Sequence, residues 1–262
     1  MDNSAPENLE QIPPAAAIPP RPGLWSGWAT FGLSVAVLSI SQLTQVLVFV
    51  ISIILMFSEG FISRDPIWLV QNILGDGMTL PLAVLFSSLV GLAVTLLFIK
   101  MRRGFSVTEY LALKKLNLKY LLLIPGMLAA TLALSILVDQ WVEIPQDEDI
   151  FYLAYSNTPW PVLFWLAIVV VGPVFEEVLF RGFLFAGLKQ TWLGAAGTIV
   201  ITGVVFALLH SAQYGVSAIA LICVLGILLG LVRWKSGSLW SSILLHGLWN
   251  MAQMIMMTIT AE

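Results

Sequence analysis

The chain has 262 residues, of which 59% are hydrophobic and only 10% are charged, with a formal net charge of −3. Because soluble domains carry roughly 25% charged residues, this composition and the mean hydropathy of +0.94 exclude an ordinary soluble protein. No basic cluster points to nucleic acid, and the single cysteine, Cys223, excludes an intramolecular disulfide.

The chain begins with a tail, residues 1–24, that is rich in Pro, Ala and acidic residues. It lacks the basic start and adjacent apolar core of a secretory signal, so we expect a disordered cytoplasmic tail. After it we expect N-terminal transmembrane helices over residues 25–155 and a second group of membrane helices, with unusual polar residues, over residues 156–262.

Seven apolar segments are long enough to be predicted as membrane-spanning helices, since a span needs about 20 residues. They are 28–57, 78–99, 120–138, 159–188, 193–210, 216–232 and 239–258. The apolar segment 66–75, PIWLVQNILG, is too short to span, and we expect it to lie along the interface or to dip into the membrane. The predicted fold is therefore all-α, a polytopic transmembrane bundle of about seven spans, or eight if segment 66–75 enters the bilayer.

Lys and Arg residues in short loops mark the cytoplasmic side of a membrane protein. They occur after the second, after the fourth and before the last predicted span, whereas residues 139–149 contain five acidic residues and no basic one. These loops agree on one orientation, with the N-terminus and the basic loops in the cytoplasm and the acidic loop and the C-terminus outside. We expect a multi-pass protein of the plasma membrane.

Three charged residues lie inside the apolar runs: Glu176, Glu177 and Arg181. Charges at membrane depth are costly and usually mark function. Glu177 and Arg181 are four residues apart and share a helix face, so they could form a purely structural salt bridge. Glu176 projects about 100° away around the helix, and that pair does not explain it.

The two histidines of the chain, His210 and His246, both lie in late predicted spans. Phe206 precedes His210 by four residues and Asn250 follows His246 by four, so each pair shares a helix face. A carboxylate or an imidazole can act as general base on water, and Asn or His can donate to an oxyanion. Two His and one Glu can also hold a divalent metal. The cluster therefore predicts a hydrolytic centre.

A helix interruption precedes the two glutamates, at Gly172 and Pro173. Proline removes one helical hydrogen bond and kinks the axis, which membrane helices tolerate where the backbone lines a cavity. An ordinary membrane-helix proline is the alternative.

Three short motifs together resemble one family. "EEVLFR" (176–181) is similar to E-E-x-x-x-R, "FALLH" (206–210) to F-x-x-x-H and "HGLWN" (246–250) to H-x-x-x-N/D. These are the motifs, in the same order, of the CPBP intramembrane proteases, also called the CAAX-protease and bacteriocin-processing or Abi-type family. The motifs cover residues 176–250 only.

The resemblance implies a catalytic core over residues 156–262 that hydrolyses peptide bonds of membrane-associated proteins or peptides, in CAAX-type or bacteriocin-leader-like processing. Glu176 would be the principal base, activating water with His210. Glu177 would complete the first motif, and His246 and Asn250 would position water or stabilise the oxyanion. Arg181 and Phe206 would support the motifs structurally.

Metal dependence stays open, although the family is often classed with the metallopeptidases. If a divalent ion such as Zn²⁺ binds, we expect Glu176, His210 and His246 to be its ligands. The sequence lacks the H-E-x-x-H pattern of a zincin site.

Two other functions fit the composition. One is a non-catalytic membrane scaffold or regulator of the same fold. The other is a transporter with an intramembrane proton relay, against which stands the absence of a sequence repeat. We expect the bilayer and a membrane-associated peptide or protein as partners, and no nucleic acid; the substrate and the oligomeric state stay open.

Overall fold

The computed structural model describes residues 23–58, 72–73, 75–139 and 150–261. Almost all of the predicted tail, most of segment 66–75 and most of the acidic loop 139–149 lie outside these residues. Within them the chain is helical and contains no strand, which confirms the predicted all-α class. The longer helices are α1 (Gly27–Ser58), α3 (Thr79–Met101), α5 (Leu118–Asp139), α10 (Gly194–Leu208), α11 (Val216–Ser236) and α12 (Leu239–Ala261).

A further helical run over residues 161–188 joins five short elements end to end. They are α7 (Pro161–Trp165), the π-helix η2 (Leu166–Val171), α8 (Gly172–Glu177), the π-helix η3 (Val178–Leu184) and α9 (Phe185–Leu188). Two short helices lie outside it, α4 (Val107–Tyr110) and α6 (Ile150–Ser156).

All seven segments predicted to span the membrane are helical in the structure. Five helices are long and apolar enough to cross a bilayer: α1, α3, α5, the run 161–188 and α11. Helix α10 has only 15 residues, and α12 has 23 but carries Ser, His, Asn and Gln side chains and is not among the five. The protein is thus a multi-pass membrane protein.

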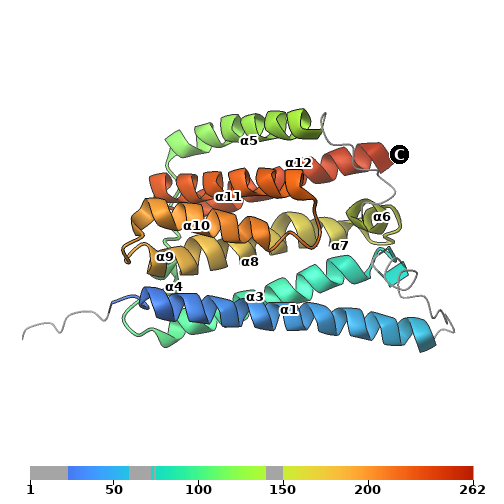
Figure 1. The fold of residues 1–262 in the computed structure, drawn as a ribbon, viewed down its shortest axis with the longest axis horizontal. Coiled ribbons are helices and arrows are strands. Elements are labelled where there is room, and N and C mark those ends of the chain that lie inside the picture. The colour runs from blue at the N-terminus through green and yellow to red at the C-terminus, as the bar shows by residue number, and fades with distance from the viewer. Residues whose placement is uncertain (1–22, 59–71, 74, 140–149, 262) are drawn as a thin grey trace, which may run out of the picture.

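The helical run 161–188 lies at the centre of the bundle (Figure 1). Helices α1 and α3 pack against it on one side and α10, α11 and α12 on the other, with α5 outside α11 and α12. Successive long helices are antiparallel, so the start of α1 and the loops 102–117, 189–193 and 237–238 meet at one end of the bundle. We call this the basic end, because every Lys and Arg of the described residues except Arg181 lies in those loops or in the adjoining helix turns.

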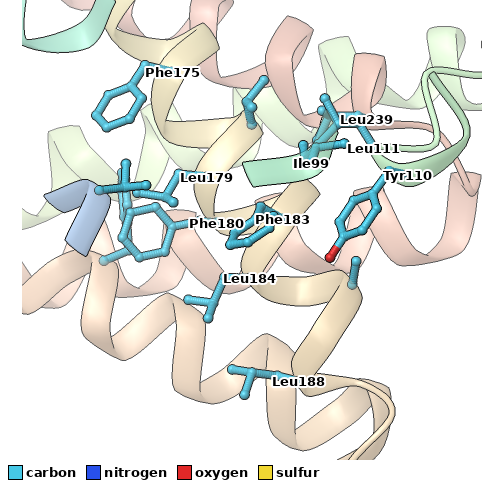
Figure 2. Packing of buried hydrophobic residues seen from close by; sticks show 14 residues of the cluster. Ile99, Tyr110, Leu111, Phe175, Leu179, Phe180, Phe183, Leu184, Leu188 and Leu239 are labelled. Carbon is cyan, nitrogen blue, oxygen red and sulfur yellow. The ribbon is translucent and has the colours of Figure 1, made fainter. Parts of the chain in front are cut away.

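The principal hydrophobic core surrounds η3. Four side chains of this segment are buried together with Phe175 of α8: Leu179, Phe180, Phe183 and Leu184 (Figure 2). Aromatic rings pack edge to face here: the Phe180 ring lies 5.5 Å from that of Phe206 on α10. Since lipid tails are as apolar as these rings, close van der Waals packing rather than removal from water holds the central run against α10. This packing fixes the height of the buried charges.

The interruption predicted at Gly172–Pro173 takes the form of a π-helical segment. Pro173 lies in the first turn of α8, and the preceding Gly172 donates its N–H to Ala167 O, five residues back. Pro173 has no N–H to donate, and a π segment is one of the identifiable ways in which a helix adjusts at such a point. The backbone carbonyls of η2 are therefore open to side chains from other helices.

Candidate active site

Glu177 and Arg181 form a fully buried ion pair in the centre of the bundle. Arg181 Nη1 donates to Glu177 Oε1 at 3.0 Å, and both side chains have no exposed surface. Arg181 Nη2 donates to the carbonyl oxygen of Gly226 on α11 at 2.9 Å. The pair predicted from the four-residue spacing is therefore present, and it also joins the central run to α11.

His246 on α12 joins this pair through its Nδ1 atom, which lies 3.0 Å from Glu177 Oε1. A carboxylate paired with a guanidinium only accepts hydrogen bonds, so Nδ1 carries a proton, and in the neutral imidazole Nε2 then has the lone pair. That Nε2 lies 3.7 Å from Glu176 Oε2, which is too long for a direct hydrogen bond. The lone pair therefore faces the second carboxylate across a short gap.

Glu176 differs from its neighbour in exposure. Its side chain is 29% exposed, whereas that of Glu177 is fully buried. The predicted angular separation of the two glutamates thus places one inside the ion-pair cluster and the other at its margin. Of the two carboxylates, Glu176 is the one that water or a substrate can reach.

His210 lies outside the helix in which it was predicted, because α10 ends at Leu208. Its Nδ1 lies 2.8 Å from the carbonyl oxygen of Phe206. Since a carbonyl only accepts, this nitrogen is the protonated one and Nε2 keeps the lone pair. Among the described residues, no hydrogen bond or ion pair joins His210 to Glu176 or to His246.

The ring of Phe206 connects the parts of the cluster. It lies 4.8 Å from the ring of His210 and 5.8 Å, edge to face, from that of His246. The guanidinium carbon of Arg181 stands 4.6 Å from its centroid, which is within cation–π distance. Phe206 thus contacts both imidazoles and covers the buried cation.

Asn250, one turn after His246 on α12, is engaged with the backbone. Its Nδ2 donates to the carbonyl oxygen of Ile168 in η2 at 2.8 Å. The amide therefore holds α12 against the π-helical segment that precedes Pro173, and this contact was not expected from the sequence.

Sequence reasoning also missed Ser242, which is fully buried on α12. It lies one turn before His246 and against the Glu177 carboxylate, while its Oγ donates to Leu239 O at 3.1 Å. Glu177 Oε2 has no hydrogen-bond partner within the described part of the chain. The spacing of Ser242 and His246, four residues apart, was the available signal.

The positions of Glu176, His210 and His246 decide whether these residues can bind a divalent metal ion together. Each imidazole offers an Nε2 lone pair, as a metal ligand must, but no three His, Cys, Asp or Glu side chains of residues 23–58, 72–73, 75–139 and 150–261 gather closely enough to hold an ion. Glu176, His210 and His246 therefore do not form a three-ligand metal site in this structure.

Comparison with known proteins places a family match on this part of the chain. Residues 158–252 match the model of the Rce1-like family, described as type II CAAX prenyl endopeptidase Rce1-like, in agreement with the resemblance of the three motifs. An uncharacterized 24.3 kDa protein of Escherichia coli is 31% identical over 98 residues, which cover 36% of this chain and 43% of that protein. No solved structure matches the chain.

Proposed function

Starting from the match of residues 158–252 to the Rce1-like family, we propose that this protein is an intramembrane endopeptidase that uses an activated water. The observation that carries the proposal is the gap between His246 Nε2 and Glu176 Oε2, 3.7 Å wide, beside a buried ion pair. One water molecule contacting both atoms would be polarised by two acceptors. Within the described part of the chain, no other group makes a hydrogen bond with either atom.

Each polar residue then has a distinct task. Glu177, held by Arg181, accepts a hydrogen bond from His246 Nδ1–H. This bond fixes the imidazole with its Nε2 lone pair toward the water. This makes Glu177 and Arg181 positioning residues. Glu176 is the base, because it is the carboxylate with access to the outside of the cluster.

The reaction is a hydrolysis by general acid–base catalysis. Glu176 takes a proton from the water, and the water oxygen forms a bond to the carbonyl carbon of the peptide. The resulting tetrahedral oxyanion collapses when the leaving nitrogen receives the proton from Glu176 and the C–N bond breaks. The products are a carboxylic acid, which then gives up its proton to the amine or to the surrounding water, and the amine, and Glu176 returns to its ionised form.

His210 contacts the same Phe206 ring as His246. With Nδ1 bonded to Phe206 O, its Nε2 is an acceptor when neutral and a donor when protonated. We assign it to the developing oxyanion or to the water, whichever faces it when the peptide is bound. Asn250, whose Nδ2 holds the Ile168 carbonyl, keeps α12 and therefore His246 in place.

We propose membrane-anchored peptides as substrates, either with prenylated C-terminal tails or of bacteriocin-leader type. We also propose a location in the plasma membrane with the N-terminus and the basic end in the cytoplasm. The gathering of the Lys and Arg side chains at one end supports this orientation, because such residues are retained on the cytoplasmic side.

The test is cleavage by purified protein in detergent. Farnesylated and leader-type reporter peptides are incubated with wild type, Glu176→Gln, His246→Ala and the surface control Lys115→Gln, and products are read by mass spectrometry. We expect cleavage by wild type and by the control only. Cleavage by Glu176→Gln at the wild-type rate would refute the assigned base, and no cleavage of any reporter by wild type would favour a non-catalytic scaffold.

A further inference from the structure

Three cations come together at the basic end, away from the cluster described above. Arg233 lies in the last turn of α11, Lys189 follows directly after α9, and Lys114 belongs to the loop that precedes α5. Arg233 and Lys189 share one aromatic surface: Lys189 Nζ and Arg233 Cζ lie 5.7 Å and 5.8 Å from the centroid of the buried Phe185 ring. Three separate parts of the chain therefore supply positive charge to one place.

No close ion pair neutralises these charges among the described residues. None of the ion pairs among the described residues includes Lys114, Lys189 or Arg233. Burial is the main cause that lowers the pKa of Lys189, and the nearby positive charges of Arg233 and Lys114 lower it further. The cations thus repel one another, and an anion bound between them would relieve that repulsion.

Arg233 adds a buried positive charge at this place. Its side chain is buried, with 5% exposure, and Nη2 donates to Leu111 O at 3.3 Å. Lys114 and Lys189, in contrast, are exposed. The two lysines are therefore the groups that an anion from outside can reach, and Arg233 adds to the positive potential beneath them.

The height of the cluster matches the headgroup layer of a membrane. Trp192 and Trp234 are exposed beside Lys189 and Arg233, and exposed Trp side chains concentrate at the membrane–water interface. Lys235 Nζ stands 4.6 Å from the Trp234 ring centroid. At this level the abundant anions with several acceptor oxygens are lipid phosphates.

We propose that Arg233, Lys189 and Lys114 form a binding site for the phosphate of an anionic membrane lipid, in the leaflet at the basic end. The two exposed lysines supply flexible ammonium groups that reach phosphate oxygens, and the buried Arg233 adds positive charge behind them. The site does not depend on the proposed peptidase function.

The experiment is native mass spectrometry of the full-length protein in neutral detergent, titrated with phosphatidylglycerol or with phosphatidylcholine. The test variant is Lys114→Gln/Lys189→Gln. The matched control, Lys115→Gln/Lys119→Gln, removes the same charge from exposed positions at the same end. A third arm adds inorganic phosphate as competitor, and thermal unfolding confirms that both variants are folded.

Wild type and control are expected to bind phosphatidylglycerol in preference to phosphatidylcholine. The test variant should bind it roughly 25-fold more weakly, because each of the two lysines at the site contributes on the order of a fivefold gain. Equal affinities of the two double variants would overturn the site. Displacement of the lipid by inorganic phosphate at a similar concentration would overturn the assignment to a lipid.

Discussion

Glu177 and His246 meet through the inner nitrogen of the imidazole, with 3.0 Å between Oε1 and Nδ1. The outer nitrogen faces the other glutamate, Glu176, at 3.7 Å. Two adjacent carboxylates in the sequence thus act on opposite sides of one ring. One lies inside a buried ion pair, and the other lies at its edge.

The two glutamates should therefore respond differently to the same substitution. Glu177→Gln leaves the Arg181 charge uncompensated in a site without exposure, and breaking a buried pair costs about 3–5 kcal/mol. Glu176→Gln should change the unfolding free energy by less than about 1 kcal/mol while lowering cleavage about 100-fold or more. Thermal unfolding in detergent, measured alongside reporter cleavage, checks both. Equal destabilisation by the two substitutions would contradict this division.

Arg181 is expected to matter through Glu177. Arg181→Met alone leaves the buried carboxylate without its cation and Gly226 O without its donor, and we expect a loss of about 3–5 kcal/mol. The double variant Glu177→Gln/Arg181→Met removes both charges, while the Gln side-chain oxygen can still accept from His246 Nδ1. It should be more stable than Arg181→Met. A double-mutant cycle on the unfolding free energy measures this coupling, and additive effects would show that the pair is not coupled.

Asn250 should act on stability through the Ile168 carbonyl. Asn250→Ala removes the 2.8 Å bond and should cost about 1 kcal/mol. Asn250→Asp should cost more, because a carboxylate facing a carbonyl oxygen cannot donate. Gln253→Ala, an exposed position on the same helix, is the control. If Asn250→Ala lowered only the cleavage rate and left thermal unfolding unchanged, the residue would be catalytic rather than positional.

The orientation in the membrane can be tested by cysteine labelling. In a Cys223→Ala background, Lys115→Cys lies at the basic end and Ser211→Cys at the opposite end, both exposed. We expect a membrane-impermeant thiol reagent added to intact cells to label Ser211→Cys and to label Lys115→Cys only after lysis, since basic loops stay in the cytoplasm. The reverse pattern would refute the proposed orientation.

The helices could be predicted from the sequence because long apolar runs have few alternatives in a bilayer. The Glu177–Arg181 pair could be predicted because it is local, four residues apart on one helix. The meeting of Glu176 with His246, which lie on different helices, could not be predicted from their spacing in the sequence. Distances between different helices depend on packing, which hydropathy does not specify.

The features that the sequence did not reveal depend on backbone geometry. Proline at position 173 predicted an interruption, but the π-helical form of η2 and the use of Ile168 O by Asn250 follow from how α12 packs on it. The early end of α10, which leaves His210 outside the helix, was equally hidden, since the apolar run continues to Leu209.

The two π-helical segments have a consequence for comparing this chain with others. A π turn holds more residues than an α turn, so each segment acts in the helix as a local insertion would, and it rotates everything beyond it about the helix axis. A helical wheel drawn at 100° per residue through 161–188 would therefore misplace Leu188 relative to Trp165 around the helix axis. A related chain of equal length that formed an α-helix in place of one of these π segments would align without a gap. Its residues beyond that point would nevertheless face α12 with a different side of the helix.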